Sequence, residues 1–552
     1  MIKQLHRYLL ILLPIICSAQ NVKEPITQLL HELVKTEGVD QALKTYEALK
    51  AQEADKYDFS FAQLNNLGYQ LIAEKREEAA VKIFQANLKA FPHMINPYYS
   101  YGHGLLKTGA NEAAIAAYTT GLKITDTLQN LTEAQRNHYN SLGSIQIRIA
   151  SNFNRSTSPD LSYVANHGGG PAGNWDAGML LDFQTERGNP TINYEANNFY
   201  NAPVPDFILD KFEQEPRPDV VSGIVKGVYR DHVSNGDIVN LSVVWDQNNW
   251  DSAFPPAIKR AVSYEGSPYF VPMSFQWNPI WYRKDIFEKV GVRPPSTWDE
   301  LLELCRKLHK AGYLPFTVSG DGWEPPVARW FAILSLRLYG PDFYEDLMAG
   351  KISWLDERVG NVFVHWKTLF DNHAFSSKSA EQDWQFAVKD LAEGKAVMWN
   401  IGEWLWEFGP IQEQKGNIGF FAMPPITQNI PQVEILHLYG AHALSTKNQK
   451  LAHEFLTYLG SEEVQRSNHK TLQYRIPAHI KAADQLSTLQ REQYDYIKKV
   501  DQLVPLFEMN THPKIANEAL RAFVDFWKNP ERIKETMVRI ESKRKEVYPS
   551  KN

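Results

Sequence analysis

The sequence has very little cysteine. Cys17 and Cys305 are the two cysteines among 552 residues, too few for a disulfide framework or a cysteine-rich zinc site. None of the 16 histidines belongs to an HExxH motif. The formal net charge is −6, from 58 basic and 64 acidic residues, so the chain lacks the broad basic field with which proteins hold nucleic acid. We therefore predict no metal, no cofactor and no nucleic-acid partner.

The chain also lacks an apolar run of the roughly 20 residues needed to span a bilayer. A shorter run, Tyr8–Ile16, lies in a leader that reads MIKQLHRYLLILLPIICSAQ. Its basic start, short apolar centre and small residues before Gln20 are typical of a secretory signal peptide. We predict cleavage after Ala19 and a periplasmic protein. Ile16 precedes Cys17 where lipoprotein signals have a small residue, which favours secretion over a lipid anchor.

The length of the chain exceeds what a single hydrophobic core supports, so more than one folding unit is expected. With 43% hydrophobic and 22% charged residues the composition is that of a globular protein. The segment SNFNRSTSPD, residues 151–160, has almost no apolar residues and predicts a linker. We predict a leader over 1–19, a helical module over 21–150 and a second domain over 161–552.

The helical module contains an internal repeat of 34 residues. The first copy has Leu64, Leu67, Gly68, Leu71, Ala80, Phe84 and Pro92; the second has Tyr98, Tyr101, Gly102, Leu105, Ala114, Tyr118 and Asp126. Only the last position breaks the pattern. Period and small residues resemble the tetratricopeptide repeat, in which Gly and Ala let two antiparallel helices touch. A plain helical bundle is the alternative, because two good copies are fewer than the three usually needed.

Beyond residue 160, short β-branched runs alternate with helices, which predicts an α/β domain. The runs are LSYVAN, TINYEAN and DVVSG, with helices expected over 175–187 and 205–214. The turn Gly168–Gly173 satisfies GxGxxG, and Glu195 lies where a ribose-binding acid would. An exported protein meets little NAD and no further dehydrogenase residues follow. We therefore favour a turn whose backbone amides approach a different ligand.

A series of motifs runs from Asp237 to Ala478. It includes Trp250-Asp251-Ser252-Ala253-Phe254, Tyr269-Phe270-Val271-Pro272, Trp281-Tyr282-Arg283-Lys284, Gly402-Glu403-Trp404 and the segment Leu451–Leu459. In this order the motifs resemble the extracellular solute-binding proteins of bacterial ABC importers, in the sugar-binding group of the maltose and glucose receptors. The resemblance covers about residues 161–547 and leaves out the helical repeats. It implies a two-lobe α/β fold whose lobes close over a sugar.

The resemblance also implies ligand-binding residues. The tryptophan at the place of Trp404 stacks on the sugar in that group, and Glu403 before it is placed to bond a hydroxyl. Gln276 and Trp277 follow the first crossover strand, where the group places a hydroxyl-binding side chain. Flat aromatic rings for the C–H face of a sugar and polar groups for its rim are the chemistry that such a site needs.

Five further residues complete the predicted site. Trp323 and Glu324 lie in a loop that resembles one carrying an aromatic ring and a carboxylate toward the cleft. His167 ends the first strand, where the group often has Trp, Asn or an acid, so this contact is a departure from the pattern. Tyr439 and His442 belong to a return segment whose backbone borders the cleft.

The predicted function is capture of a sugar and its delivery to an ABC permease. A sensor that signals to a membrane partner is an alternative, because the helical repeats are an unusual addition that could bind another protein. A secreted carbohydrate-active enzyme is the second alternative, with Glu403 and either Glu324 or Asp321 as an acid/base pair. The resemblance favours a binding protein with no catalytic residues.

Overall fold

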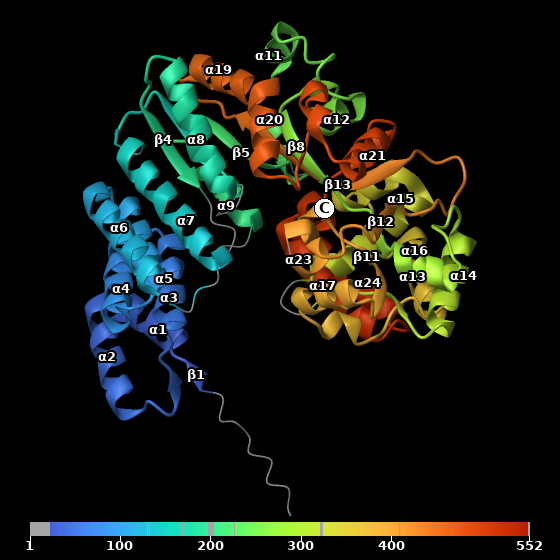
Figure 1. The fold of residues 1–552 in the computed structure, drawn as a ribbon, viewed down its shortest axis with the longest axis horizontal. Helices are drawn as coiled ribbons and strands as arrows, with labels where there is room; N and C mark the ends of the chain where they lie inside the picture. Colours follow the sequence, from blue (N-terminus) through green and yellow to red (C-terminus); the bar gives the residue numbers. More distant parts are fainter. Residues whose placement is uncertain are drawn as a thin grey trace, which may run out of the picture. The chain divides into compact units, whose positions relative to one another are not determined.

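The computed structural model describes residues 23–129, 131, 133–153, 155–166, 171–196, 204–225, 227–320, 324–407 and 409–549. The predicted ligand residues His167 and Trp323 lie outside these ranges. The chain divides into two compact units, the first ending at Ser151 and the second beginning at Asn152 (Figure 1). Among the described helices, none offers an apolar stretch long enough to cross a membrane.

The first unit is helical. Its helices are α1 (Thr27–Thr36), α2 (Val39–Gln52), α3 (Phe61–Ala73), α4 (Glu77–Ala90), α5 (Ile95–Lys107), α6 (Asn111–Thr127) and α7 (Glu133–Asn152). The two-residue strands β1 (Glu24–Pro25) and β2 (Tyr57–Asp58) pair in parallel. Helices adjacent in sequence pack together as α1 with α2, α3 with α4 and α5 with α6.

Residues 34 positions apart in the helical unit make equivalent contacts. A Cβ atom on Gly68 would come within 2.3 Å of the Phe84 ring, and one on Gly102 within 2.6 Å of the Tyr118 ring. In both helix pairs the absence of a side chain on the first helix therefore makes room for an aromatic ring on the second.

The second unit contains two sheets. The larger one has the strand order β14-β8-β13-β5-β3-β4, with β15 beside β13. Its strands are β3 (Leu161–Ala165), β4 (Ile192–Ala196), β5 (Val220–Ile224), β8 (Val271–Trp277), β13 (Val433–Ala443), β14 (Ile476–Pro477) and β15 (Gln502–Val504). Helices α8 (Pro171–Glu186), α9 (Val204–Glu213), α19 (Gln449–Leu459) and α20 (Glu462–Thr471) accompany it (Figure 1). The three predicted strands and two predicted helices after the linker are confirmed here.

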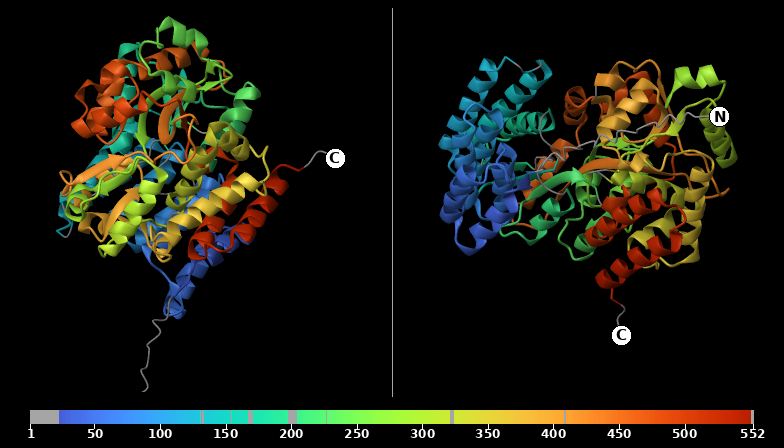
Figure 2. Two further views of the ribbon diagram at one scale, coloured as in Figure 1. Left: turned by 90° about the vertical axis from the view of Figure 1, so that its right-hand side faces the viewer. Right: turned by 90° about the horizontal axis from the view of Figure 1, so that it is seen from below.

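The smaller sheet has the order β10-β11-β9-β12. Its strands are β9 (Ile280–Arg283), β10 (Leu314–Phe316), β11 (Ala396–Asn400) and β12 (Ile418–Phe421). Around it lie α13 (Lys284–Val290), α14 (Trp298–Lys310), α15 (Pro325–Met348), α16 (Glu357–Asp371), α17 (Trp384–Glu393), α23 (Pro513–Lys528) and α24 (Ile533–Val547). The C-terminal helices α23 and α24 pack on α15 and α16, far upstream in the sequence (Figure 2).

The chain crosses three times between the part around the larger sheet and the part around the smaller sheet, and the third crossing leads from β15 toward α23. β8 of the larger sheet leads through Asn278 and Pro279 into β9, and β12 leads back into β13. We call the part around the larger sheet lobe 1 and the part around the smaller sheet lobe 2. Smaller elements are α10 (Arg230–Ser234), α11 (Ser242–Gln247), α12 (Pro256–Ala261), β6 (Ser263–Tyr264), β7 (Ser267–Pro268), α18 (Gly409–Gln412), α21 (Thr488–Ile497) and α22 (Phe507–Asn510).

Candidate functional site

The candidate site lies where the end of β8 meets the end of β11 and the short 3-10 helix η3 (Glu403–Glu407). The backbone N–H of Trp277 donates to Glu403 Oε2 at 3.3 Å. Asn400 Nδ2 donates to the carbonyl of Asn278 at 3.0 Å. A Cβ atom on Gly402 would lie 2.9 Å from Trp404 Cδ1 and 3.1 Å from Asn278 Oδ1, so glycine is needed for this approach. The structure thus brings together the predicted residues Trp277, Glu403 and Trp404.

Glu403 is the least satisfied carboxyl group of this cluster. Its side chain is 1% exposed, and Oε1 has no hydrogen-bond partner among the described residues. Burial raises the pKa of Glu403 well above its usual range, and the Trp277 N–H offsets only part of this effect. A buried carboxyl group without a cation beside it is stable in its neutral form.

Trp277 itself supports the crossover strand. Its side chain is fully buried, and the indole N–H donates to Glu434 Oε2 at 3.1 Å. The ring stacks on Tyr496 with 4.6 Å between centroids. Glu434 also accepts a bond from the Tyr496 hydroxyl at 2.7 Å and pairs with Arg337 Nη2 at 2.5 Å. Because its ring is enclosed, we assign Trp277 to holding Glu403 through the backbone rather than to stacking on a ligand.

Trp404 is half-buried in an aromatic cluster of lobe 2. It makes edge-to-face contacts with Trp384 and Trp399, with ring centroids 5.8 and 6.1 Å apart. Trp399 is 1% exposed, whereas Trp406 packs edge to face on Trp281 at 5.3 Å. Trp404 therefore combines rigid packing with a partly accessible surface next to Glu403, which a stacking platform requires.

A second polar group lies along the crossing strands. β8 and β13 are antiparallel, with Gln276 opposite His437 and Ser274 opposite Tyr439. The Arg475 guanidinium lies 3.9 Å from the centroid of the Tyr439 ring. Burial, together with the charges of Arg329 and Arg475, lowers the pKa of His437 to about 3, so this imidazole is neutral. Gln276 and Tyr439 were predicted from sequence; His437 and the two arginines were not.

Lobe 1 contributes two residues that sequence reasoning missed, Trp175 and Asp176 in the first turns of α8. Asp176 is 1% exposed and accepts a bond from the Tyr194 hydroxyl at 3.2 Å. Its Oδ1 and the Trp175 indole nitrogen have no partner among the described residues. Burial raises the pKa of Asp176 to about 7, although Arg475 and Tyr194 lower it. Their place directly after the predicted glycine-rich turn was a signal that could have found them.

The other predicted residues lie elsewhere or are not described. Glu324 is partly buried at the N-terminus of α15. His442 is 2% exposed among Phe212, Tyr229 and Phe270, and burial lowers its pKa to about 3.

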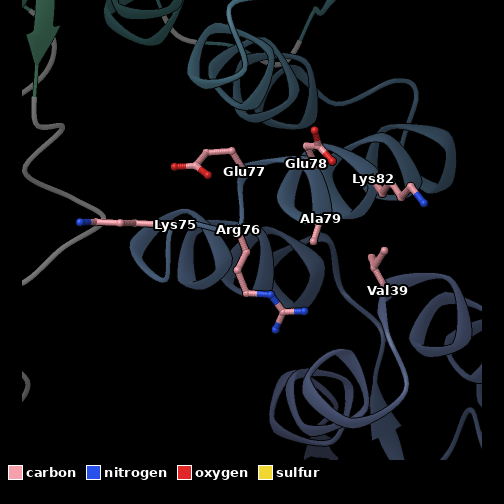
Figure 3. A pocket seen from close by; sticks show the side chains of 7 residues that line it. All are labelled: Val39, Lys75, Arg76, Glu77, Glu78, Ala79 and Lys82. Atoms are coloured by element: carbon pink, nitrogen blue, oxygen red, sulfur yellow. The ribbon is translucent and has the colours of Figure 1, made fainter. Parts of the chain in front are cut away.

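A hollow of about 460 Å³ opens on the helical unit, around the start of α4 (Figure 3). Its lining residues are Val39, Lys75, Arg76, Glu77, Glu78, Ala79 and Lys82. Arg76 donates to the Val34 carbonyl at 3.0 Å and Lys82 pairs with Asp40 at 2.8 Å. In Figure 3 the ends of Lys75 and Lys82 point away from one another. None of the lining side chains is buried, so the hollow is not a preorganised site.

Comparison with known proteins decides the family. The profile of the bacterial extracellular solute-binding proteins matches residues 175–466, slightly more than half of the chain. The chain belongs to this family. The solute-binding protein is 24% identical over 242 residues to an uncharacterised ABC transporter extracellular-binding protein of Pyrococcus horikoshii. That match covers 43% of this chain and 53% of the relative.

A second relative is a probable sugar-binding periplasmic protein of Brucella suis, 26% identical over 181 residues, covering 32% of this chain and 41% of the relative. The solute-binding protein thus spans about half the length of the curated relatives it matches. Among solved structures, the bacterial solute receptor AcbH has a TM-score of 0.64 at 20% identity, over 70% of this chain and 98% of the receptor. Maltose-bound MalE3 of T. maritima has a TM-score of 0.54 at 16% identity, over 70% and 99%. These likenesses confirm the predicted two-lobe fold.

Proposed function

We propose that this solute-binding protein captures a sugar beside Glu403 and Trp404 and delivers it to an ABC importer. The observation that carries the proposal is a buried carboxyl group, with an oxygen that has no partner among the described residues, next to a partly buried tryptophan, at a point where the chain crosses between the lobes. A sugar offers hydroxyl groups to the first and a C–H face to the second. Catalysis is not part of this proposal.

The comparisons support the same substrate class. A relative from Streptococcus mutans, 25% identical over 196 residues, is named a multiple sugar-binding protein. The structural neighbours include AcbH, a receptor with a preference for β-D-galactopyranose, and the maltose-bound MalE3. We therefore propose that the ligand is a neutral mono- or oligosaccharide. Gln276 and Tyr439 are proposed as further contacts, and Glu324, His442, His167 and Trp323 stay predictions.

A binding screen tests this function. Calorimetry with D-galactose, maltose, D-tagatose and N,N′-diacetylchitobiose should detect at least one ligand, and a ligand at 100 times its Kd should stabilise the fold by about 2.7 kcal/mol. All fifteen tryptophans lie between Trp175 and Trp527, so tryptophan fluorescence follows the second unit selectively. Absence of any sugar response, together with binding of an amino acid or a peptide, would contradict the proposal.

Delivery to an importer and signalling to a sensor require different membrane partners. The helical unit lies outside the matched residues 175–466, which favours an additional protein partner. We propose that this unit is tetratricopeptide-like and binds that partner. An ABC importer reconstituted in proteoliposomes should hydrolyse ATP faster with the sugar-loaded protein, and failure to stimulate it would favour the sensor.

The export of the protein is also a proposal. Residues 1–19 have the pattern of a signal peptide, and the matched family is extracellular. Intact-mass measurement on periplasmic material should show a chain that begins at Gln20. A chain that retains the leader, or that carries a lipid on Cys17, would contradict it.

A further inference from the structure

We propose that Glu403 binds the ligand as a neutral carboxylic acid that donates a hydrogen bond from Oε1, so that the protein takes up its sugar less tightly as the pH rises. The inference rests on the proposed function, since it requires that a sugar enters beside Glu403. It adds a proton to the binding reaction and makes Glu403 a donor instead of the acceptor that an ionised carboxylate would be.

The geometry of Glu403 fixes where the proton sits. Oε2 accepts the backbone N–H of Trp277 at 3.3 Å and is therefore the carbonyl-like oxygen. Oε1 has no partner among the described residues, in a side chain that is 1% exposed. The proton accordingly belongs on Oε1, which leaves an O–H donor that lacks an acceptor until a ligand arrives.

The surroundings offer no charge that would ionise the group. β8 (VPMSFQW) and α18 (GPIQ), which pack on η3, have no titratable side chain. β9, β11 and α17 also reach η3, through the rings of Trp281, Trp399 and Trp384. The charged side chains of β9 and α17 are engaged with other partners: Arg283 bonds Asp285 and the carbonyl groups of Leu391 and Ala392, Lys389 pairs with Glu393, and Asp390 bonds Gln382. Trp277 also connects Glu403 to the ion pair of Arg337 with Glu434. The Arg337 guanidinium is already occupied by Glu434 and by the carbonyl groups of Met423 and Val433. It is therefore not available to neutralise Glu403.

The neighbouring residue explains which ligand group fits. Asn278 is 6% exposed, its Oδ1 has no partner among the described residues, and its Nδ2 donates to the Ile435 carbonyl. Oδ1 lies within 3.1 Å of the position of a Cβ on Gly402, the residue before Glu403. One acceptor and one donor in adjacent places match a sugar hydroxyl group, which donates to Asn278 and accepts from Glu403.

The sign of the pH dependence follows from this arrangement. A ligand that accepts a hydrogen bond from the Glu403 carboxyl group binds only its neutral form. Binding therefore raises the pKa of Glu403 further, and the proton stays on Glu403 in the complex. Affinity is then constant below the pKa of the free protein and falls above it, by up to about tenfold per pH unit. An ionised Glu403 that accepts from sugar hydroxyl groups would give the opposite slope.

The experiment is calorimetry with the best sugar of the panel, from pH 5 to the highest pH at which circular dichroism shows an intact fold, on the full mature chain. The parent protein should lose affinity toward alkaline pH and should take up a proton on binding, measured by comparing buffers of different ionisation enthalpy. Glu403→Gln keeps a donor at the same place but cannot ionise, so its affinity should not vary with pH. Glu413→Gln, the same change at an exposed carboxyl group, should keep the slope of the parent.

Asp176 also titrates near neutral pH and needs its own control. Asp176→Asn should keep the slope. The inference is overturned if the parent affinity is flat or rises with pH, or if the slope survives Glu403→Gln or disappears in Asp176→Asn. In those cases sugar binding itself stands. If no sugar binds at any pH, the proposed function fails and this inference fails with it.

Discussion

Two carboxyl groups touch the same tryptophan and have opposite surroundings. Glu434 is 2% exposed and accepts the indole N–H of Trp277, while Glu403 is 1% exposed and accepts its backbone N–H. Glu434 has a cation, Arg337, and a phenol, Tyr496, in addition. Glu403 has one backbone donor and an unpartnered oxygen. A carboxylate that holds the fold together is fully satisfied, whereas one that awaits a ligand is left incomplete.

The largest effect on stability is expected from a substitution of Glu434, the carboxyl group whose hydrogen bonds are satisfied. Glu434→Gln removes the charge that compensates Arg337, which is 5% exposed. Loss of one member of a buried pair costs about 3–5 kcal/mol, because the other charge stays buried. Urea unfolding followed by tryptophan fluorescence should show this loss in the second unit. Glu403→Gln, at a carboxyl group that is already neutral, should change the unfolding free energy by less than about 1 kcal/mol.

Equal destabilisation by the two substitutions would contradict the comparison, because it would mean that Glu403 is charged and paired as Glu434 is. If Glu434→Gln does not fold, Arg337→Met tests the same pair from the other side. The double variant Arg337→Met with Glu434→Leu leaves neither charge in the core, so it should lose less stability than Glu434→Gln alone.

Removal of the Trp404 ring should have the next largest effect, on binding instead of folding. Loss of the stacking surface should cost about 2–4 kcal/mol, which is roughly 30- to 1,000-fold in affinity. Calorimetry of Trp404→Ala with the best sugar measures it. Trp406→Ala is the control, because Trp406 packs on Trp281 and should lose stability more than affinity. Unchanged affinity in Trp404→Ala would place the sugar elsewhere, with Trp175 and Asp176 as the next candidates.

The contrast between these carboxyl groups explains what the sequence could and could not predict. Gly402, Glu403 and Trp404 are contiguous, so a local motif was enough to predict them as part of a ligand site. The partners of Glu434 are 97 positions away at Arg337 and 62 positions away at Tyr496. No local sequence pattern predicts hydrogen bonds between residues so far apart in the chain. For the same reason the sequence predicted Trp277 as a ligand residue but could not predict that its ring is enclosed.

Local signals succeeded where one contact repeats or one helix turn decides. The 34-residue period predicted equivalent positions, and the structure gives Gly68 and Gly102 the same aromatic contact. Burial of a single polar residue was harder. Asp176 follows the glycine-rich segment 168–173, whose last three residues belong to α8 and not to the predicted turn. Its raised pKa arises from burial, which the composition of that segment does not encode.

Asp176 extends the comparison to lobe 1 with a smaller expected effect. Its pKa of about 7 in the fold exceeds the ordinary value of 3.8, so the stability it contributes is complete below 3.8 and is lost as the pH rises through 7. Asp176→Asn removes this loss. The unfolding free energy of the variant minus that of the parent should therefore be about 1–3 kcal/mol larger at pH 8 than at pH 4. Urea unfolding at the two pH values measures it; an equal difference at both would show that Asp176 stays charged in the fold.

The smallest effect on the site should come from the helical unit. Gly102→Ala places a Cβ atom 2.6 Å from the Tyr118 ring and should destabilise that unit by about 1–2 kcal/mol through overpacking. The second unit is a separate compact body that contains all the tryptophans. Its unfolding transition, followed by fluorescence, should therefore not move, and its sugar affinity should stay within about twofold of the parent. Far-UV circular dichroism, which reports on both units, should show the earlier loss of helix.

Gly178→Ala in α8, with nothing within 4 Å of its Cβ position, is the matched control and should stabilise the second unit by about 0.5–1 kcal/mol. If Gly102→Ala weakens sugar binding more than Gly178→Ala does, the helical unit is coupled to the lobes, and the satisfaction of Glu403 then depends on contacts beyond its own lobe.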